Sequence, residues 1–178
     1  MSKKILLLHG WGGSDFPHWQ SWLASELAKE YGKVSFLKFS NFDTPKLDLW
    51  IRELKEELKS FQPDIVICHS LANTLWFHLC NTSQIKIVER LYLVAPPSMR
   101  CDIEELCEFF PVQTPQKLHA KEAILITSTD DPYMSEEEAK HLQKSLDIPR
   151  KTLLNAGHIN AESGYGEWEW IYKELREL

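Results

Sequence analysis

The chain has 178 residues, of which 43% are hydrophobic, 11% aromatic and 26% charged, and its formal net charge is −6. This length predicts one domain over residues 1–178, because two independent cores would each approach the lower size limit for stable folding. The acidic balance argues against a surface that binds nucleic acid, and the longest apolar runs are far shorter than the roughly 20 residues of a membrane span.

Apolar runs of β type alternate with amphipathic helical segments, which is the pattern of an α/β domain with a largely parallel sheet. The first run, residues 4–8, is almost continuously apolar, as expected for a strand that is covered on both faces. In chain order, the six predicted strands are residues 4–8, 34–39, 65–68, 91–94, 123–127 and 152–154.

Helical spacing of apolar residues predicts helices between these strands, on both faces of the sheet. Thr44 and Pro45 are typical of a helix start, with a capping side chain before a proline in the first turn. Ser135 and Glu138 have the spacing of a capping box. The helical stripes lie within residues 19–27, 47–58, 71–75, 139–146 and 168–175.

One long irregular stretch, residues 95–122, is rich in proline and contains Cys101 and Cys107. Connections of this length in a compact domain usually have a function of their own. The stretch is too short to be a domain, so we predict a short lid or binding loop.

The four cysteines are Cys68, Cys80, Cys101 and Cys107, and they show neither a C-x-x-C pair nor the spacing of a zinc site. We predict free thiols in a reducing cytoplasm, no structural metal and a cytoplasmic location. For Cys68 we expect a buried, inert thiol, since apolar burial raises the pKa of a cysteine.

Ser70 stands where the third predicted strand turns into a helix, and small residues flank it at two positions before and after, Cys68 and Ala72. They replace the two glycines of the usual G-x-S-x-G pattern. Small residues here allow strand and helix to approach around a strained turn that presents the hydroxyl as a nucleophile at the carboxyl edge of the sheet. Taken alone, the same serine also fits a plain helix N-cap.

A glycine-rich segment, HGWGG at residues 9–13, directly follows the first predicted strand. Glycine backbone can direct an N–H into a site, and acyl transfer needs two such donors for the oxyanion. The N–H groups of Trp11 and Leu71 are the predicted pair. An ordinary turn remains an alternative, whereas a dinucleotide-binding loop lacks its last glycine, since Asp15 stands there, and no Walker lysine follows.

An acid and a histidine follow the last two predicted strands, in the segments STDDP at residues 128–132 and AGH at residues 156–158. With Ser70 they give the chain order Ser…Asp…His of α/β-hydrolases. In this interpretation His158 takes the proton of Ser70 and later returns it to the leaving group, while Asp131 orients the imidazole and stabilises its charged form. Asp130 is the rival acid, and Asp131 is favoured because it adjoins Pro132.

His9 and His69 are rival bases, because both lie near the predicted site in the sequence pattern. His9 precedes the glycine-rich segment, and His69 adjoins Ser70 on a turn whose side chains point apart. We therefore expect structural roles for both.

The segments HGWGG, CHSLA, STDDP and GHINAESGYGEW together resemble the small serine hydrolases of the family that contains retinoblastoma-binding protein nine and the bacterial protein YdeN. The resemblance spans nearly the whole chain. It implies a single-domain, three-layer α/β-hydrolase fold without a large cap domain, and a triad carried by Ser70, His158 and Asp131. The L-x-C-x-E motif of the human relative is absent, so the resemblance supplies no protein partner.

The function that we predict is hydrolysis of small carboxylic esters, or of thioesters or amides, through an acyl-enzyme that needs no metal or organic cofactor. The substrate is a small molecule, with neither nucleic acid nor membrane as partner. Residues predicted to line an apolar acyl pocket are Trp11, Phe16, Trp19, Pro96, Phe109 and Phe110, although core packing accounts for them equally well.

Two other classes of function are considered. A binding protein with the hydrolase fold and little or no turnover would explain the substituted glycines at Cys68 and Ala72. A nucleotide-binding α/β protein would fit the alternation of strands and helices, but the chain has no phosphate-cradling motif.

Overall fold

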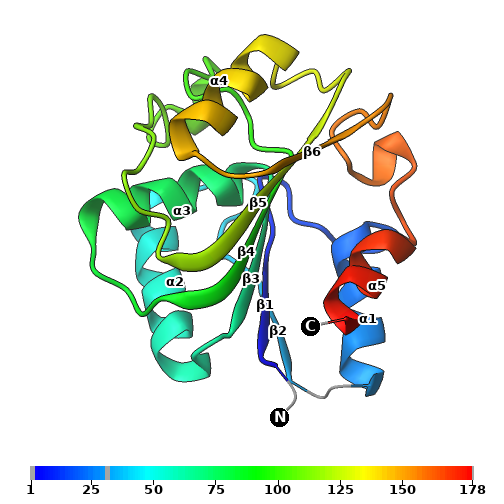
Figure 1. Ribbon diagram of the computed structural model, residues 1–178. Coiled ribbons are helices and arrows are strands. Elements are labelled where there is room, and N and C mark those ends of the chain that lie inside the picture. The colour runs from blue at the N-terminus through cyan, green and yellow to red at the C-terminus, as the bar shows by residue number, and fades with distance from the viewer. Residues whose placement is uncertain (1–2, 31–32, 178) are drawn as a thin grey trace.

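The computed structural model describes residues 3–30 and 33–177, and within them six strands form one parallel sheet in the order β2-β1-β3-β4-β5-β6 (Figure 1). This confirms the predicted parallel α/β architecture. The strands are β1 (Ile5–Leu8), β2 (Val34–Leu37), β3 (Ile65–His69), β4 (Val88–Val94), β5 (Ala120–Ser128) and β6 (Arg150–Leu153).

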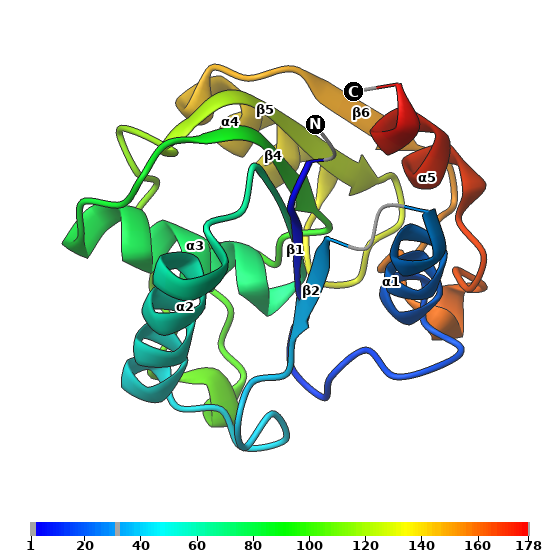
Figure 2. The same cartoon turned by 90° about the horizontal axis from the view of Figure 1, so that it is seen from below.

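The helices cover both faces of the sheet, so the domain has three layers. Helices α1 (Trp19–Glu30) and α5 (Glu169–Arg176) lie side by side on one face, while α2 (Leu47–Phe61), α3 (Leu71–Thr82) and α4 (Glu136–Leu146) lie on the other (Figures 1 and 2). The described residues contain no separate cap domain, and none of their helices is long and apolar enough to cross a bilayer.

Strand β1 shows why its residues are apolar throughout. Ile5 and Leu7 pack into the core beneath α1 and α5, whereas Leu6 and Leu8 pack into the core beneath α2 and α3. All four are buried. Since side chains alternate across a strand, a strand between two helical layers must be apolar at every position.

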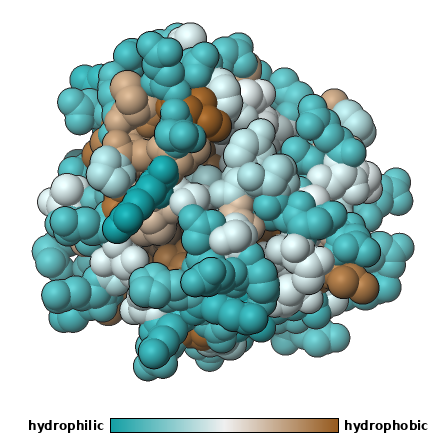
Figure 3. All heavy atoms as spheres, turned by 90° about the horizontal axis from the view of Figure 1, so that it is seen from above, coloured by the Kyte–Doolittle hydropathy of each residue, from teal (hydrophilic) through white to brown (hydrophobic). Residues whose placement is uncertain are grey.

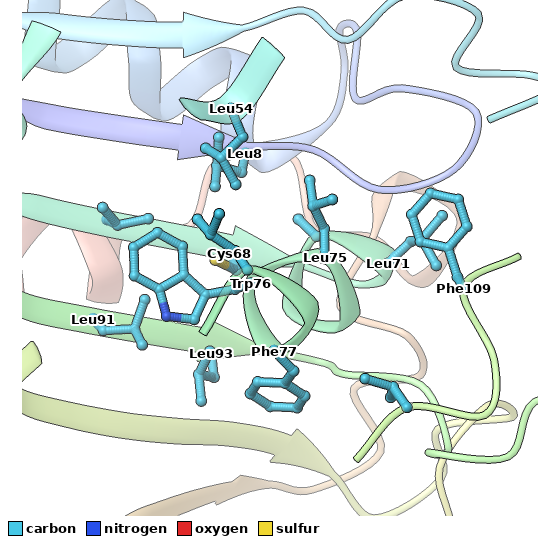
Figure 4. Packing of buried hydrophobic residues seen from close by; sticks show 14 of the residues in the cluster. Leu8, Leu54, Cys68, Leu71, Leu75, Trp76, Phe77, Leu91, Leu93 and Phe109 are labelled. Carbon is cyan, nitrogen blue, oxygen red and sulfur yellow. The ribbon is translucent and has the colours of Figure 1, made fainter. Parts of the chain in front are cut away.

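Cys68 belongs to the larger of these cores, where Figure 4 shows it among Leu8, Leu75 and Trp76. The thiol is free and fully buried, and burial raises its pKa well above the ordinary value. The other three cysteines are also free. The prediction of a buried Cys68 is therefore confirmed, and the inertness of its thiol stays a prediction.

Strand boundaries differ from the predicted ones by one to three residues. At the end of β2 the chain leaves the sheet after Leu37, because the N–H of Phe39 donates to His9 Nε2 and no longer takes part in a strand pairing. Strand β5 begins at Ala120, three residues earlier than predicted, because its first residues pair with β4 from Val88 onward.

Two helix starts illustrate what the sequence could and could not predict. The capping box of α4 is present, since Ser135 Oγ accepts from the N–H of Glu138 while Glu138 accepts from the N–H of Ser135. The predicted cap of α2 at Thr44 is wrong. That helix starts at Leu47, whose N–H donates to Glu108 Oε2, a carboxylate supplied by the 95–122 segment.

The 95–122 segment lies against the ends of α2 and α3 and is fixed at several points. Glu108 also forms an ion pair with Lys46. His78 Nε2 is hydrogen-bonded to the carbonyl of Phe109, and the Trp76 indole donates to the carbonyl of Leu118. The segment is thus fixed to the rest of the domain, and it contains one short 3-10 turn, η1 (Glu104–Leu106), and the first residues of β5.

The topology places a crevice between the carboxyl ends of β1 and β3. From β1 the chain continues to the edge strand β2, whereas from β3 it continues in the opposite direction to β4. Ligands of open α/β sheets bind where the strand order reverses in this way. Seen from above, this end of the molecule is largely hydrophilic, with small apolar areas between polar residues (Figure 3).

Candidate active site

Ser70 lies at this crevice, between the end of β3 and the start of α3, in a backbone conformation that residues other than glycine rarely adopt (φ 54°, ψ −125°). Its hydroxyl does not cap α3. Instead, Ser70 Oγ lies 2.8 Å from His158 Nε2. The plain N-cap interpretation is therefore wrong. Cys68 and Ala72, two residues before and after Ser70, are fully buried. Because both side chains are small, they permit the strained turn that the motif predicts.

The imidazole of His158 bridges Ser70 and Asp131. His158 Nδ1 lies 3.0 Å from both carboxylate oxygens of Asp131, and its ring is almost fully buried, as is the Asp131 carboxylate. The N–H of Tyr133 donates to Asp131 Oδ1, which satisfies that oxygen from a second side. The proton between His158 and Asp131 is assigned from this geometry to Nδ1, which leaves Nε2 free to accept from Ser70.

Asp130, the rival acid, is hydrogen-bonded to two loops and not to the His158 ring. Its carboxylate accepts from Ser128 Oγ at 2.7 Å and from the N–H of Gly157 at 2.8 Å. These hydrogen bonds lower the pKa of Asp130, the one from Ser128 most strongly. The side chain therefore ties the acid loop after β5 to the histidine loop after β6.

The rival bases are also occupied elsewhere. His9 is buried between two main-chain groups, since Nδ1 donates to the carbonyl of Gly10 and Nε2 accepts from the N–H of Phe39. Burial lowers its pKa. His69 directs Nε2 toward the carbonyl of His158. Neither ring is hydrogen-bonded to Ser70 in the described chain.

Of the predicted oxyanion donors, Leu71 directly follows Ser70, and Trp11 belongs to the loop after β1 and lines the same cavity as Ser70. A Cβ added to Gly10 would lie 3.1 Å from both Ser70 Oγ and the backbone N of Leu71, so the β1 loop approaches the serine as closely as glycine allows. Leu71 opens α3, and N–H groups in the first turn of a helix have no partner within the helix. Within the described residues, neither Trp11 nor Leu71 donates its N–H to a protein acceptor.

An open cavity of about 410 Å³ lies over these groups. Its walls come from the loop after β1, from the 95–122 segment and from the chain after β6. The lining residues include Trp11, Asp15, His18, Ser70, Leu71, Pro97, Cys101, Ile103, Leu106, Tyr133, His158, Asn160 and Glu162.

Comparison with known proteins decides the family. A family model described as "Serine hydrolase" matches residues 5–177. The chain belongs to this serine hydrolase family. It is similar to the putative hydrolase YdeN of Bacillus subtilis, with 22% identity over 98% of this chain and 95% of the relative.

Solved structures share the fold of this serine hydrolase. The ydeN gene product of B. subtilis superposes with a TM-score of 0.86 at 21% identity, covering 98% of this chain and 97% of the other. A putative YdeN-like hydrolase from Pectobacterium atrosepticum gives 0.79 at 26% identity over 98% and 89%. An esterase domain from a Rhodothermus marinus protein gives 0.65 at 14% identity over 98% and 85%. The expected resemblance and the α/β-hydrolase fold are thus confirmed.

For most of the residues considered for an acyl pocket, the structure of this serine hydrolase supports the alternative of core packing. Of the six, only Trp11 lines the cavity; Trp19 and Phe109 are fully buried in the cores, and Phe16 is exposed and is not a lining residue. Pro96 is buried, and Phe110 packs against the core. Aromatic residues were a poor guide because large apolar side chains gain most by burial.

Tyr133 is a residue of the candidate site in this serine hydrolase that contacts both Asp131 and His158 and that the sequence did not reveal. Besides its N–H contact with Asp131, its ring lies edge to face against the His158 imidazole, with centroids 4.6 Å apart. Its carbonyl accepts from the N–H of Ser98, at the start of the 95–122 segment. In the sequence, its position two residues after Asp131 was the only indication of these contacts.

The close approach of Gly10 gives a testable expectation. In Gly10→Ala, the new Cβ would lie 2.7 Å from Ser70 Cβ, so the loop or the turn must shift. We expect the kcat for ester hydrolysis to fall roughly 10²-fold, as when an oxyanion donor is displaced. Gly164→Ala is the matched control, because it adds strain at φ 85° with no atom within 4 Å. It should lower the melting temperature and leave kcat within about threefold; equal losses of kcat would contradict the steric argument.

Proposed function

We propose that this serine hydrolase cleaves small carboxylic esters through an acyl-enzyme, with Ser70 as nucleophile, His158 as general base and acid, and Asp131 as the group that orients the imidazole. The observation that carries the proposal is the continuous chain of contacts from Asp131 through His158 to Ser70 Oγ, at 3.0 and 2.8 Å. Each distance is short enough for proton transfer or for orientation by a hydrogen bond.

The chemistry follows from this arrangement. As Ser70 Oγ attacks the ester carbonyl, its proton passes to His158 Nε2, and the imidazolium that forms is stabilised by Asp131. The carbonyl oxygen becomes an oxyanion that accepts from the N–H groups of Trp11 and Leu71. The tetrahedral intermediate then expels the alcohol, which takes the proton from Nε2. Water, activated by His158 in the same way, cleaves the acyl-enzyme to the carboxylic acid and restores Ser70.

The cavity supports a small and uncharged or cationic substrate. Its volume of about 410 Å³ is within the range of small-molecule sites. Asp15 and Glu162 line it, whereas no lysine or arginine does among the described residues, and Lys38 forms an ion pair with Asp15, so the unfavourable charge for an anionic substrate comes mainly from Glu162. In this proposal the leaving group lies beside His158, and the apolar side chains of Ile103 and Leu106, which also line the cavity, offer contacts to the acyl group.

Ester bonds are our choice over thioester or amide bonds, which the same triad could attack. The fold-level likeness to an esterase domain supports this choice. The proposed steps need neither a metal nor an organic cofactor. The free thiols of the chain fit a reducing compartment, which supports our proposal of a cytoplasmic location.

The experiment that tests the proposal is intact-mass labelling with a fluorophosphonate, a probe that reacts with activated serines. We expect one adduct per wild-type chain, mapped to the peptide that contains Ser70, and much slower labelling of His158→Ala. An ester, thioester and amide panel with matched acyl groups then ranks the substrates. A folded wild type without adduct would overturn the proposal and favour a binding protein with the hydrolase fold.

A further inference from the structure

The backbone beside His158 is strained. Ile159 has φ 50°, in the left-handed region, although it is β-branched and fully buried. A β-branched residue in this region is a genuine outlier. Such a conformation persists only where the surrounding structure enforces it, so some contacts must hold this part of the histidine loop in place.

Two ring N–H groups supply those contacts. His69 Nε2 lies 3.1 Å from the carbonyl oxygen of His158, and Trp19 Nε1 donates to the carbonyl of Ile159 at 2.8 Å. The acceptors are consecutive in the chain, whereas the donors come from the end of β3 and the start of α1. On the other side, the N–H of His158 donates to Ser163 Oγ at 3.1 Å. The peptide groups around His158 are thus fixed from three directions.

The direction of the His69 contact follows from its other nitrogen. His69 Nδ1 is buried and has no hydrogen-bond partner among the described residues, and a carbonyl oxygen can only accept. The proton of the neutral ring therefore belongs on Nε2. Burial, next to His18 and Trp19, lowers the pKa of His69 well below its usual value, so the ring stays a neutral donor.

We propose that His69 and Trp19 are positioning residues for His158: their ring N–H groups hold the carbonyls of His158 and Ile159 and keep the imidazole aligned with Ser70. The inference rests on the proposed function, because it assigns these residues to the same reaction. His69 is also the direct chain neighbour of Ser70, so one side chain links the nucleophile turn to the histidine loop. A displacement of the catalytic group by about 1 Å can cost roughly 10² in rate.

The test uses four variants, assayed for kcat, KM and fluorophosphonate labelling rate well below their melting temperatures. His69→Phe keeps a buried ring but removes the donor, and kcat should fall roughly 10- to 100-fold with KM within about threefold. His69→Gln restores an N–H near the position of Nε2, and should recover kcat to within about fivefold of wild type. A loss of packing alone would not be rescued by glutamine.

Trp19→Phe and Trp50→Phe form the matched pair. Both tryptophans are fully buried and donate the indole N–H to a carbonyl, but the acceptor of Trp50 is Ser40, outside the histidine loop. Trp19→Phe should lower kcat about tenfold, and Trp50→Phe should lower stability only. Equal kcat in the pair, no rescue by His69→Gln, or a change confined to KM would overturn the positioning role. A wild type that neither labels nor hydrolyses esters would instead overturn the proposed function itself, and the positioning role with it.

Discussion

Ser70→Ala should reduce ester kcat/KM by roughly 10⁴-fold or more and abolish fluorophosphonate labelling. The hydroxyl is the atom that attacks in the proposed mechanism, and it lies 2.8 Å from the nitrogen that would take its proton. Residual hydrolysis would come from attack by water on an ester that the cavity binds and the oxyanion donors polarise. Steady-state kinetics and intact-mass spectrometry on the same preparations measure both effects.

The fold should tolerate this substitution. Ser70 Oγ does not cap α3, so its removal leaves no helix N–H without a partner, and alanine carries the same Cβ into the strained turn. We expect a melting temperature close to that of the wild type. Ser60→Ala, at an exposed site on α2, is the control and should keep wild-type kinetics. Substantial turnover by folded Ser70→Ala would mean that another group is the nucleophile.

Asp131→Asn should lower kcat by about 10³- to 10⁴-fold, with much less change in KM. The amide can present an N–H to His158 Nδ1, which favours the wrong tautomer and removes the charge that stabilises the imidazolium. Both carboxylate oxygens lie 3.0 Å from Nδ1, so an amide places an NH₂ group at one of these positions. Steady-state kinetics across a range of ester concentrations separates kcat from KM.

Asp130→Asn is the matched control, since it alters the neighbouring residue in the same way. Asp130 Oδ1 accepts from Ser128 and Gly157, and the amide oxygen of asparagine can accept from both. We expect kcat to fall less than about tenfold, with a lower melting temperature as the main effect. If Asp130→Asn were the more damaging of the two, the assignment of the acid would be reversed.

The alignment of Ser70, Asp131 and His158 could be anticipated because each follows a different strand of one parallel sheet. The carboxyl ends of parallel strands share an edge of the sheet. Loops that follow three such strands therefore lie at the same side of the domain. The structure does bring these side chains into contact, and their catalytic roles remain our proposal. The predicted strands and the capping box at Ser135 are confirmed for a different reason, which is that each depends on local sequence.

The features that escaped prediction depend on contacts between distant segments. Helix α2 starts at Leu47 because Glu108, 61 residues further along, receives its first N–H. Trp19 resembles a pocket residue in sequence, but its indole is buried against the histidine loop. Ile103 and Leu106 line the cavity only because the 95–122 segment folds back over the nucleophile turn. No local pattern encodes any of these three placements.

The contacts that fix the 95–122 segment separate the residues that line the cavity from the residues that hold the segment in place. Its fixed points at Glu108, Phe109 and Leu118 lie beyond the stretch from Pro97 to Leu106 that lines the cavity, and within that stretch Ser98 is a further fixed point, since its N–H donates to the carbonyl of Tyr133. Changes at Cys101 and Ile103 can therefore reshape the wall of the cavity while these anchors and the contacts of Ser70, Asp131 and His158 keep their places. Under the proposed function, such a division would let substrate preference change while the chemistry stays the same, since the two are located on different parts of the fold.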